Sequence, residues 1–449
     1  MAVDRKPEFF KGAQLRVGIV GCGYVGLPLG LRFAEVGHRV TGFDLDQKKV
    51  DALNRGQSYI GHVPTAKIQQ YVRSRHFGAT SNFTELGRMD AILICVPTPL
   101  DEKREPDLQY VEQTARAVAA TLTRGQLVVL ESTTYPGTTE ELVLPILTEA
   151  GLHCPVDVAG YEKGSDFFLA YSPEREDPGN KQYGLAQIPK VVGGVNAASA
   201  RAAQALYGQI VARVVAVSST RAAEMAKLLE NIFRCVNIAL VNELKLLCQR
   251  MGMDVWEVID AAATKPFGFM PFYPGPGLGG HCIPVDPFYL SWKAKEYDFA
   301  TRFIELAGEI NTAMPYHVVD AVAGALNTRS KPLKGARILL LGIAYKKDVD
   351  DMRESPSLKI LELLGERGAK VDYNDPYFPE LPKLRHYHFE GKRSVKIDGG
   401  VLGSYDCVLI STDHSIYDYA AIVESAQLVV DARNATRRVT RHRQKIVLC

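Results

Sequence analysis

A glycine-rich loop around one cysteine is the segment best suited to covalent chemistry. It runs from Phe272 to Pro287 and places glycines at 275, 277, 279 and 280 shortly before Cys282. Glycines let a backbone approach a ligand closely, and a cysteine thiolate is an effective nucleophile near neutral pH. Asp286 follows four residues later, where its carboxylate can orient a water or an amine. From the loop alone, a nucleophile and an incidental structural thiol are equally good interpretations.

A second segment, Gly21-Cys22-Gly23-Tyr24-Val25-Gly26, matches the dinucleotide fingerprint G-x-G-x-x-G. It leaves a predicted strand, Leu15 to Val20, and opens a predicted helix, Val25 to Val36. The glycines permit a tight turn against a pyrophosphate, and the helix N-terminus offers N–H groups to the phosphates. Asp44 ends the next predicted strand, where a carboxylate binds ribose hydroxyls and repels the 2′-phosphate of NADP. NAD is therefore the expected cofactor; the alternative is a structural turn in a domain that binds another nucleotide.

Lys227 and Asn231 form a third candidate pair. They are spaced i, i+4 on a long predicted helix, Ala222 to Arg250, so they share one helix face. A lysine on such a helix is more often a solvated surface charge than a catalytic group. The spacing alone does not choose between the two interpretations.

The elements that must position these residues form an α/β pattern. Short apolar runs at Ala91 to Val96, Gln126 to Glu131 and Lys190 to Gly193 alternate with helical stretches, which predicts a doubly wound parallel sheet. The 449 residues suggest about three domains. We expect an NAD-binding Rossmann-type domain (1–217), a central all-helical domain that carries the long helix and the cysteine loop (218–330), and a smaller Rossmann-like C-terminal domain (331–449).

Composition narrows the class of protein. The 53 basic and 51 acidic residues give a net charge of +2, which offers no support for nucleic-acid or membrane binding. No apolar run approaches the about 20 residues that span a bilayer, and the N-terminus does not resemble a signal peptide. The eight cysteines include no C-x-x-C pair and no zinc-ligand spacing. We therefore expect a cytoplasmic enzyme with reduced thiols and no metal.

Taken together, these segments resemble the UDP-glucose/GDP-mannose dehydrogenase family of nucleotide-sugar 6-dehydrogenases. The resemblance extends from Val17 to about Arg433. The motifs that carry it, in order along the chain, are Gly21–Gly26, Cys95-Val-Pro-Thr-Pro99, Glu131-Ser-Thr-Thr-Tyr-Pro-Gly137, Ser172-Pro-Glu-Arg-Glu176, Lys227 with Asn231, Gly279-Gly-His-Cys282 with Asp286, and Tyr345-Lys-Lys-Asp348 with Arg353-Glu-Ser-Pro356.

The resemblance implies a four-electron oxidation that consumes two NAD per turnover. A UDP-sugar loses hydride from its C6 alcohol, Cys282 captures the aldehyde as a thiohemiacetal, a second hydride transfer leaves a thioester, and water releases the acid. A covalent link of this kind holds the aldehyde and divides a difficult conversion into steps. The family also implies a homodimer joined through the helical middle domain.

The resemblance also assigns roles residue by residue. Lys227 and Asn231 stabilise developing oxyanions, Asp286 helps to handle the water, Thr134 lies near substrate and water, and Glu174 acts on acid–base steps or positions water. Cofactor contacts are implied for Gly21, Gly23, Tyr24, Val25, Gly26, Asp44, Thr98, Thr133 and Arg353. Substrate contacts are implied for Arg175, Tyr273, Gly279, Tyr345, Lys346 and Arg433.

Two departures point to the sugar. Arg175 follows Glu174 where UDP-glucose enzymes carry apolar residues, and Val285 precedes Asp286 where they carry a lysine. Both resemble the branch that acts on UDP-N-acetylhexosamines, so UDP-N-acetylglucosamine is the expected substrate, with UDP-N-acetylmannosamine and UDP-glucose as alternatives. A single-step β-hydroxyacid-type dehydrogenase would need neither Cys282 nor a UDP-binding domain. A catalytically inactive nucleotide-binding scaffold would not need the complete set of catalytic residues.

Overall fold

The computed structural model describes residues 6–12, 14–101, 105–156, 165–175, 184–280, 283–384 and 386–449. The chain divides into two compact units, residues 1–230 with 288–299 and residues 231–287 with 300–449. Each unit contains one sheet. The α/β fold class expected from the sequence is confirmed, while the three domain boundaries expected above stay a prediction.

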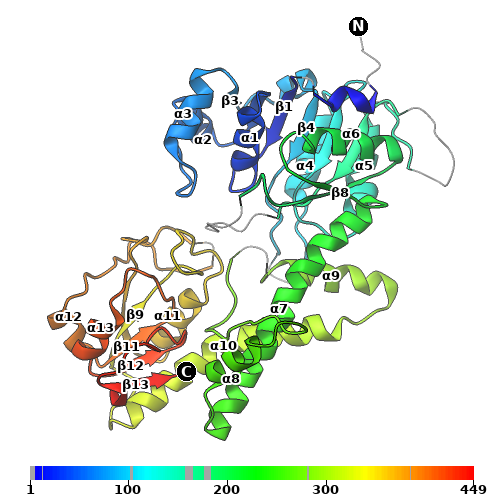
Figure 1. Ribbon diagram of the computed structural model, residues 1–449. Coiled ribbons are helices and arrows are strands. Elements are labelled where there is room, and N and C mark those ends of the chain that lie inside the picture. The colour runs from blue at the N-terminus through cyan, green and yellow to red at the C-terminus, as the bar shows by residue number, and fades with distance from the viewer. Residues whose placement is uncertain are drawn as a thin grey trace. The chain divides into compact units, whose positions relative to one another are not determined.

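The first unit is built on an eight-stranded sheet in the order β3-β2-β1-β4-β5-β6-β7-β8 (Figure 1). Its strands are β1 Arg16–Val20, β2 Arg39–Phe43, β3 Phe77–Thr80, β4 Ala91–Ile94, β5 Leu127–Leu130, β6 Phe168–Tyr171, β7 Lys190–Gly194 and β8 Val214–Ala216. The first six strands have the order of a dinucleotide-binding fold. The sequence predicted parallel pairing throughout, but β6 and β7 run antiparallel. In an antiparallel pair the end of one strand lies beside the start of the other, so the end of β6 and the start of β7 are at the same edge of the sheet.

Helices cover both faces of this sheet. One face packs against α1 Gly26–Glu35, α3 Thr65–Arg73 and α6 Ala197–Tyr207, and the other against α4 Gln109–Ala119 and α5 Leu144–Thr148. In β4, Leu93 belongs to the first core and Ile92 to the second, so both faces of the strand are buried. The remaining elements of this region are η1 Pro7–Phe10, α2 Gln47–Asn54, η2 Phe83–Arg88 and η3 Thr139–Val143.

The middle of the chain is helical, as predicted. The helix expected at Ala222 to Arg250 is α7, Thr220–Met251, which begins in the first unit and continues in the second. The other elements here are α8 Val255–Ala263, α9 Asp286–Ala294, η4 Lys295–Tyr297 and α10 Arg302–Asn327. The side chain of Asp254 accepts a hydrogen bond from the Trp256 N–H, which explains why α8 begins where it does.

The second unit contains a five-stranded parallel sheet in the order β10-β9-β11-β12-β13 (Figure 1). Its strands are β9 Arg337–Leu341, β10 Lys370–Asn374, β11 Cys407–Ile410, β12 Val429–Asp431 and β13 Ile446–Leu448. Its helical segments are α11 Pro356–Glu366, α12 Gly399–Gly403, α13 Tyr419–Ser425 and η5 Arg443–Lys445. One face packs against α10 and α11 and the other against α13. This strand order is the other common doubly wound arrangement.

Three further properties concern only the described parts of the chain. No helix there is both long and apolar enough to cross a membrane. No group of three or more His, Cys, Asp or Glu side chains there is arranged to hold a metal ion. The seven cysteines in those parts are all unpaired and buried. The eighth, Cys282, lies outside the described residues.

Candidate active site

The turn after β1 has the geometry of a dinucleotide cradle. Gly21 has φ +93°, and a Cβ on it would lie 2.5 Å from the Cys95 carbonyl oxygen. A Cβ on Gly26, the first residue of α1, would lie 1.9 Å from the Gly21 carbonyl oxygen. A Cβ on Gly23, in contrast, would meet nothing within 4 Å among the described residues. The outer glycines are therefore required by the protein itself, while Gly23 leaves space for a bound group.

Asp44 follows β2 and is fixed beside this turn. Its carboxylate accepts hydrogen bonds from the N–H groups of Cys22 at 3.1 Å and Asp46 at 3.0 Å, and its side chain is 12% exposed. Burial raises the pKa of the Cys22 thiol to about 12, and the charge of Asp44 adds to that rise. Asp44 thus lies at the carboxyl edge of the sheet, where this fold places a carboxylate that binds the ribose hydroxyls. The residues present fit NAD.

Two threonine motifs meet at the same edge. The Thr98 hydroxyl donates to the Thr133 carbonyl at 2.8 Å, and the Tyr289 hydroxyl donates to the Thr98 carbonyl at 2.5 Å. Thr134 is fully buried, and its hydroxyl has no hydrogen-bond partner among the described residues. A buried hydroxyl without a partner is costly, so it marks a place where a water or a ligand group fits.

Lys227 and Glu174, which are distant in sequence, are in direct contact. The Lys227 ammonium donates to the backbone carbonyl of Glu174 and is 7% exposed, so it is not the solvated surface charge that base rates favour. Arg175 forms an ion pair with Glu230 at 2.6 Å and also donates to the Pro189 carbonyl at 2.7 Å. The structure thus brings together two residues predicted separately, and it adds Glu230 as a partner of Arg175.

Glu174 also belongs to a group of residues at this edge whose other members, Lys190, Glu131 and Tyr207, were not singled out from the sequence. The Lys190 ammonium contacts the carboxylates of Glu131 at 2.5 Å and Glu174 at 3.4 Å, and the Tyr207 hydroxyl donates to Glu131. The sequence analysis named Glu131 only as the first residue of the motif that ends at Gly137, and Lys190 only as the first residue of a predicted strand. A lysine at the first position of an otherwise apolar predicted strand is the sequence signal that could have identified this group.

In the second unit, Asn231 and Asp286 are joined by a hydrogen bond from the amide to the carboxylate. Both side chains are buried, and Arg234, one turn further along α7, donates to the Asn231 amide oxygen. Arg234 was also missed, although its i, i+3 spacing from Asn231 places it on the same helix face. The Asn231 amide oxygen accepts from Arg234 while its nitrogen donates to Asp286, so the two contacts together fix the orientation of the amide.

The loop before the cysteine packs against the turn that carries Tyr345. A Cβ on Gly279 would lie 2.6 Å from the Tyr345 Cβ, and the Gly280 N–H donates to the Arg353 carbonyl at 3.0 Å. Arg353 itself pairs with Asp351 at 2.7 Å. Burial raises the pKa of Asp351 to about 6. Side chains larger than glycine would separate this loop from the Tyr345 turn.

Three other predicted substrate residues, Tyr273, Lys346 and Arg433, also lie in the second unit. Arg433 donates to the Ser411 carbonyl at 3.1 Å, and a Cβ on Gly275 would lie 2.6 Å from its guanidinium. The Tyr273 side chain is 46% exposed and its hydroxyl donates to Asp260 at 2.7 Å. Lys346 is partly buried beside Tyr345. Arginine, lysine and tyrosine side chains of this kind suit a diphosphate.

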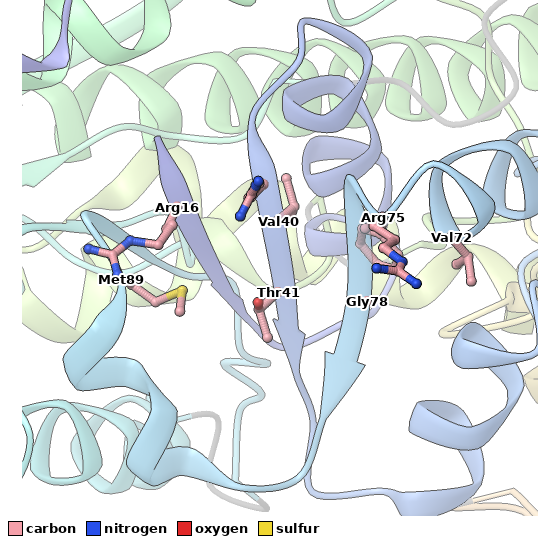
Figure 2. A pocket seen from close by; sticks show the side chains of 9 residues that line it. Arg16, Val40, Thr41, Val72, Arg75, Gly78 and Met89 are labelled. Carbon is pink, nitrogen blue, oxygen red and sulfur yellow. The ribbon is translucent and has the colours of Figure 1, made fainter. Parts of the chain in front are cut away.

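A pocket of about 350 Å³ lies elsewhere in the first unit, between the amino-terminal parts of β1 and β2 and the start of β3 (Figure 2). Arg16, Arg39 and Arg75 line it together with apolar residues. Arg16 is already paired with Asp90 at 3.0 Å. None of the predicted site residues lines this pocket, so we assign it no part in the chemistry.

Comparison with known proteins decides the family. Residues 15–211, 221–313 and 339–438 match, in turn, the NAD-binding, central and UDP-binding domains of the UDP-glucose/GDP-mannose dehydrogenase family. The chain belongs to this family. It is therefore an NAD-dependent nucleotide-sugar dehydrogenase, and such enzymes use two NAD per turnover.

Three relatives illustrate the range of sugars within the family. The chain is 35% identical over 403 residues to UDP-N-acetyl-D-glucosamine 6-dehydrogenase of Pseudomonas aeruginosa, which covers 90% of this chain and 91% of the relative. The solved structure of UDP-D-ManNAc dehydrogenase from Pyrococcus horikoshii has a TM-score of 0.83 at 32% identity and covers 97% and 98% of the two chains. UDP-glucose dehydrogenase from Pyrobaculum islandicum has a TM-score of 0.82 at 28% identity and covers 97% of each chain.

Proposed function

We propose that the chain oxidises the C6 hydroxyl of UDP-N-acetylglucosamine to a carboxylate, with Cys282 as the covalent nucleophile. The observation that carries the proposal is the buried hydrogen bond from Asn231 to Asp286. It fixes a carboxylate four residues after the cysteine. A dehydrogenase that stops after one hydride transfer has no thioester to hydrolyse, so it has no use for such a carboxylate.

The proposed reaction balances over four stages. The C6 alcohol loses a hydride and a proton to give the aldehyde, and the Cys282 sulfur then bonds to the aldehyde carbon to give a thiohemiacetal. Loss of a second hydride and proton gives a thioester. Water breaks the carbon–sulfur bond and releases the carboxylate and the thiol. When bound, NAD accepts the hydride in each of the two oxidation stages.

The residues of the chain supply charge and position. We assign the Lys227 ammonium and the Asn231 amide to the oxyanions that develop at C6, because fixed donors lower the energy of such charge where water is excluded. Asp286 orients the hydrolytic water. Glu174 and the unpartnered Thr134 hydroxyl hold a water or exchange a proton at the same stages.

The binding residues form two sets, one for each ligand. For NAD we assign Gly21, Gly23, Tyr24, Val25, Gly26, Asp44, Thr98, Thr133 and Arg353. For the UDP-sugar we assign Arg175, Tyr273, Gly279, Tyr345, Lys346 and Arg433. The match of residues 339–438 to the UDP-binding domain of the family supports the three members of the second set that lie within it, Tyr345, Lys346 and Arg433.

Arg175 is the main support for an N-acetylated sugar. Glu230 and the Pro189 carbonyl hold its guanidinium, yet the side chain stays 25% exposed, and among the described residues these contacts do not use all five of its N–H donors. The Pseudomonas relative named for UDP-N-acetylglucosamine supports this sugar, while the name of the Pyrococcus structure favours UDP-N-acetylmannosamine as the second candidate.

The test is a count of NADH formed from UDP-N-acetylglucosamine, UDP-N-acetylmannosamine and UDP-glucose, with product masses. We expect two NADH per UDP-N-acetylglucosamine, a uronic acid product, and loss of turnover in Cys282→Ser but not in the control Cys248→Ser. Two NADH from another sugar alone would replace the substrate and keep the chemistry. One NADH with a stable aldehyde, unaffected by Cys282→Ser, would overturn the mechanism.

We also propose that the protein is a homodimer joined through α7. Five apolar side chains there are 39–61% exposed and follow one helix stripe: Phe233, Leu240, Leu244, Leu247 and Met251. Apolar rows of this length normally pack against another helix, and a second copy offers the same row. Light scattering should give twice the chain mass for the native protein and the chain mass for Leu244→Glu/Leu247→Glu. A native monomer at micromolar concentration would contradict the proposal.

A further inference from the structure

A buried ionic cluster at the carboxyl edge of the first sheet consists of Lys190, Glu131, Glu174 and Tyr207, with the Lys190 side chain 6% exposed and the Glu131 side chain 0%. Of these four residues, only Glu174 has a role in the chemistry described so far. Two carboxylates share one ammonium, and each ion that is removed from water costs several kcal/mol before pairing. A cluster this unfavourable to bury needs a reason beyond stability.

The sheet register explains how the cluster forms. In the antiparallel pair, Tyr171 lies opposite Gly193, and continuing this register by three residues sets Glu174 opposite Lys190. In the neighbouring parallel pair, Leu130 lies opposite Tyr171, so Glu131 follows at the same edge. Antiparallel pairing at this one position therefore brings a lysine between two carboxylates that come from different motifs.

Glu174 is the member of the cluster that reaches the chemistry. Its carboxylate contacts the Lys190 ammonium at 3.4 Å and accepts the Arg175 N–H at 2.6 Å, while its backbone carbonyl accepts the Lys227 ammonium. Arg175 in turn donates to the carbonyl of Pro189, the residue directly before Lys190. The side chain and the backbone of one residue thus connect the cluster with the lysine assigned to the oxyanion.

We propose that Lys190 is a positioning residue for the reaction, which holds the Glu174 carboxylate in place and, through the Glu174 backbone, sets the position of the Lys227 ammonium. Glu131 and Tyr207 hold Lys190 from the opposite side. Burial raises the pKa of Glu131, and the ammonium of Lys190 opposes that rise. Burial raises the pKa of the Cys95 thiol, which follows β4. The charges of Glu131 and Glu174 add to that rise, and the charge of Lys190 opposes it. The inference rests on the roles proposed above for Glu174 and Lys227.

The test compares Lys190→Met, Lys190→Arg and the paired variant Glu131→Gln/Lys190→Met with the surface control Lys67→Met. Lys67 pairs with Glu35 and both side chains are 39% exposed, so removing its charge has little consequence. Lys190→Met alone leaves a buried charge without its partner and risks unfolding. The paired variant removes the ammonium together with the fully buried Glu131 carboxylate and leaves only the Glu174 carboxylate, whose side chain is 13% exposed. We therefore expect it to stay folded and to isolate the effect on Glu174.

In the paired variant we expect kcat to fall by about 100-fold, since a misplacement of about 1 Å has that effect. The acidic limb of the pH profile should move up by about one pH unit, because a carboxylate that loses a nearby cation has a raised pKa. The KM for NAD should not change, and Lys190→Arg should recover part of kcat. A folded paired variant with the native kcat and pH profile would overturn the proposal.

Each variant is assayed on whichever nucleotide sugar the native enzyme oxidises. Failure of the native enzyme to release two NADH concerns the proposed function. Failure of the paired variant to differ from the native enzyme concerns Lys190 alone. Thermal unfolding of every variant confirms that slow turnover is not loss of folded protein.

Discussion

Both sheets have a glycine turn after their first strand, but the acidic residue and the helix that follow the turn differ between them. After β1, Gly21 has φ +93° and lies against the Cys95 backbone at the end of β4. After β9, Gly342 has φ +87°, and a Cβ on it would lie 2.4 Å from Thr412 at the end of β11. In both, a glycine lets the chain leave the first strand close to its neighbour, which is the first requirement of a nucleotide-binding edge.

The acidic residue after the second strand differs between them. Asp44 accepts two backbone N–H groups and keeps part of its side chain exposed, which suits a ribose. Asp375 is buried, accepts from Ile343 and Ala344, and contacts His414 at 3.1 Å. The second carboxylate is therefore fully used inside the protein and holds its own turn in place.

The helix that follows differs as well. In the first unit α1 begins directly after the glycine turn, so the N–H groups of its first turn are available to a pyrophosphate. In the second unit residues 342–355 separate β9 from α11, and the loop between them carries Tyr345 and Lys346. With the assignments proposed above, backbone N–H groups bind the dinucleotide pyrophosphate in the first unit, and side chains bind the UDP group in the second.

The largest effect that would sharpen this contrast is expected from Gly23→Ala. A Cβ there meets no described protein atom, so stability should not change, whereas the close approach of the pyrophosphate is lost. The Kd for NADH should rise by about 5- to 150-fold, as overpacking by about 1–3 kcal/mol implies. Calorimetric titration with NADH and with UDP measures both sites, with Gly365→Ala as the control. Unchanged NADH affinity would separate this turn from the cofactor.

The matching change in the second unit is Arg433→Met. Loss of a charge-assisted hydrogen bond of 1.5–3 kcal/mol should weaken UDP binding by about 10-fold or more and leave NADH binding unchanged. Lys331→Met, which removes an exposed partner of Asp406 in the same unit, is the control. Equal UDP affinity in the two variants would show that side chains do not carry the second site.

Stability should depend on pH with opposite sign in the two units. Burial raises the pKa of Glu224 to about 7, so its contribution is lost as pH rises from 4.5 toward 7. Burial acts against ionisation of Asp375 too, but the hydrogen bonds from His414 and backbone N–H groups outweigh it and hold its pKa below 3.8. The Asp375 carboxylate therefore stabilises the folded protein above pH 3.8, and this stabilisation is lost only as pH falls below that value.

Glu224→Gln and Asp375→Asn test these signs. Glu224→Gln should remove a fall of up to about 3 kcal/mol in the free energy of unfolding between pH 4.5 and 7, at about 1.4 kcal/mol per pKa unit. Asp375→Asn should instead flatten the dependence at acidic pH. Denaturant unfolding across pH gives both slopes. Parallel slopes in the two variants would contradict the contrast.

The smallest expected effect is on cofactor choice. Asp44→Asn removes the charge that repels a 2′-phosphate, so the ratio of kcat/KM for NADP over NAD should rise on the order of tenfold. Asp375→Asn should leave that ratio unchanged, since its carboxylate is used within its own unit. A rise in both variants would mean that the effect is not specific to the ribose.

The sequence predicted the local features well. The glycine turn, Asp44, the long helix and most strands depend on neighbouring residues, and their patterns are complete within short segments. The strands β3, β6, β8 and β13 were missed, although β4 and β5 are equally short and were predicted. Three of the missed strands, β3, β8 and β13, lie at the edge of a sheet and are largely not buried, so they lack the continuous apolar run that marked β4 and β5.

Contacts between distant segments could not be predicted. Lys190 meets Glu131 only because one strand pair is antiparallel, and that pairing is not encoded in either segment alone. Arg234 could have been found from its spacing to Asn231, whereas Glu230 as the partner of Arg175 could not. Helix spacing is visible in a sequence, and the register between strands is not.

The most direct test of the central claim is to quench the enzyme during turnover with NAD and UDP-N-acetylglucosamine, and to weigh the peptide that contains Cys282. Asp286→Asn should slow hydrolysis and increase the trapped species. We predict a mass increase on Cys282 equal to the acylated nucleotide sugar, accompanied by two NADH per adduct. Two NADH and a uronic acid product with Cys282 unmodified at every quench time, in both the native enzyme and Asp286→Asn, would contradict it.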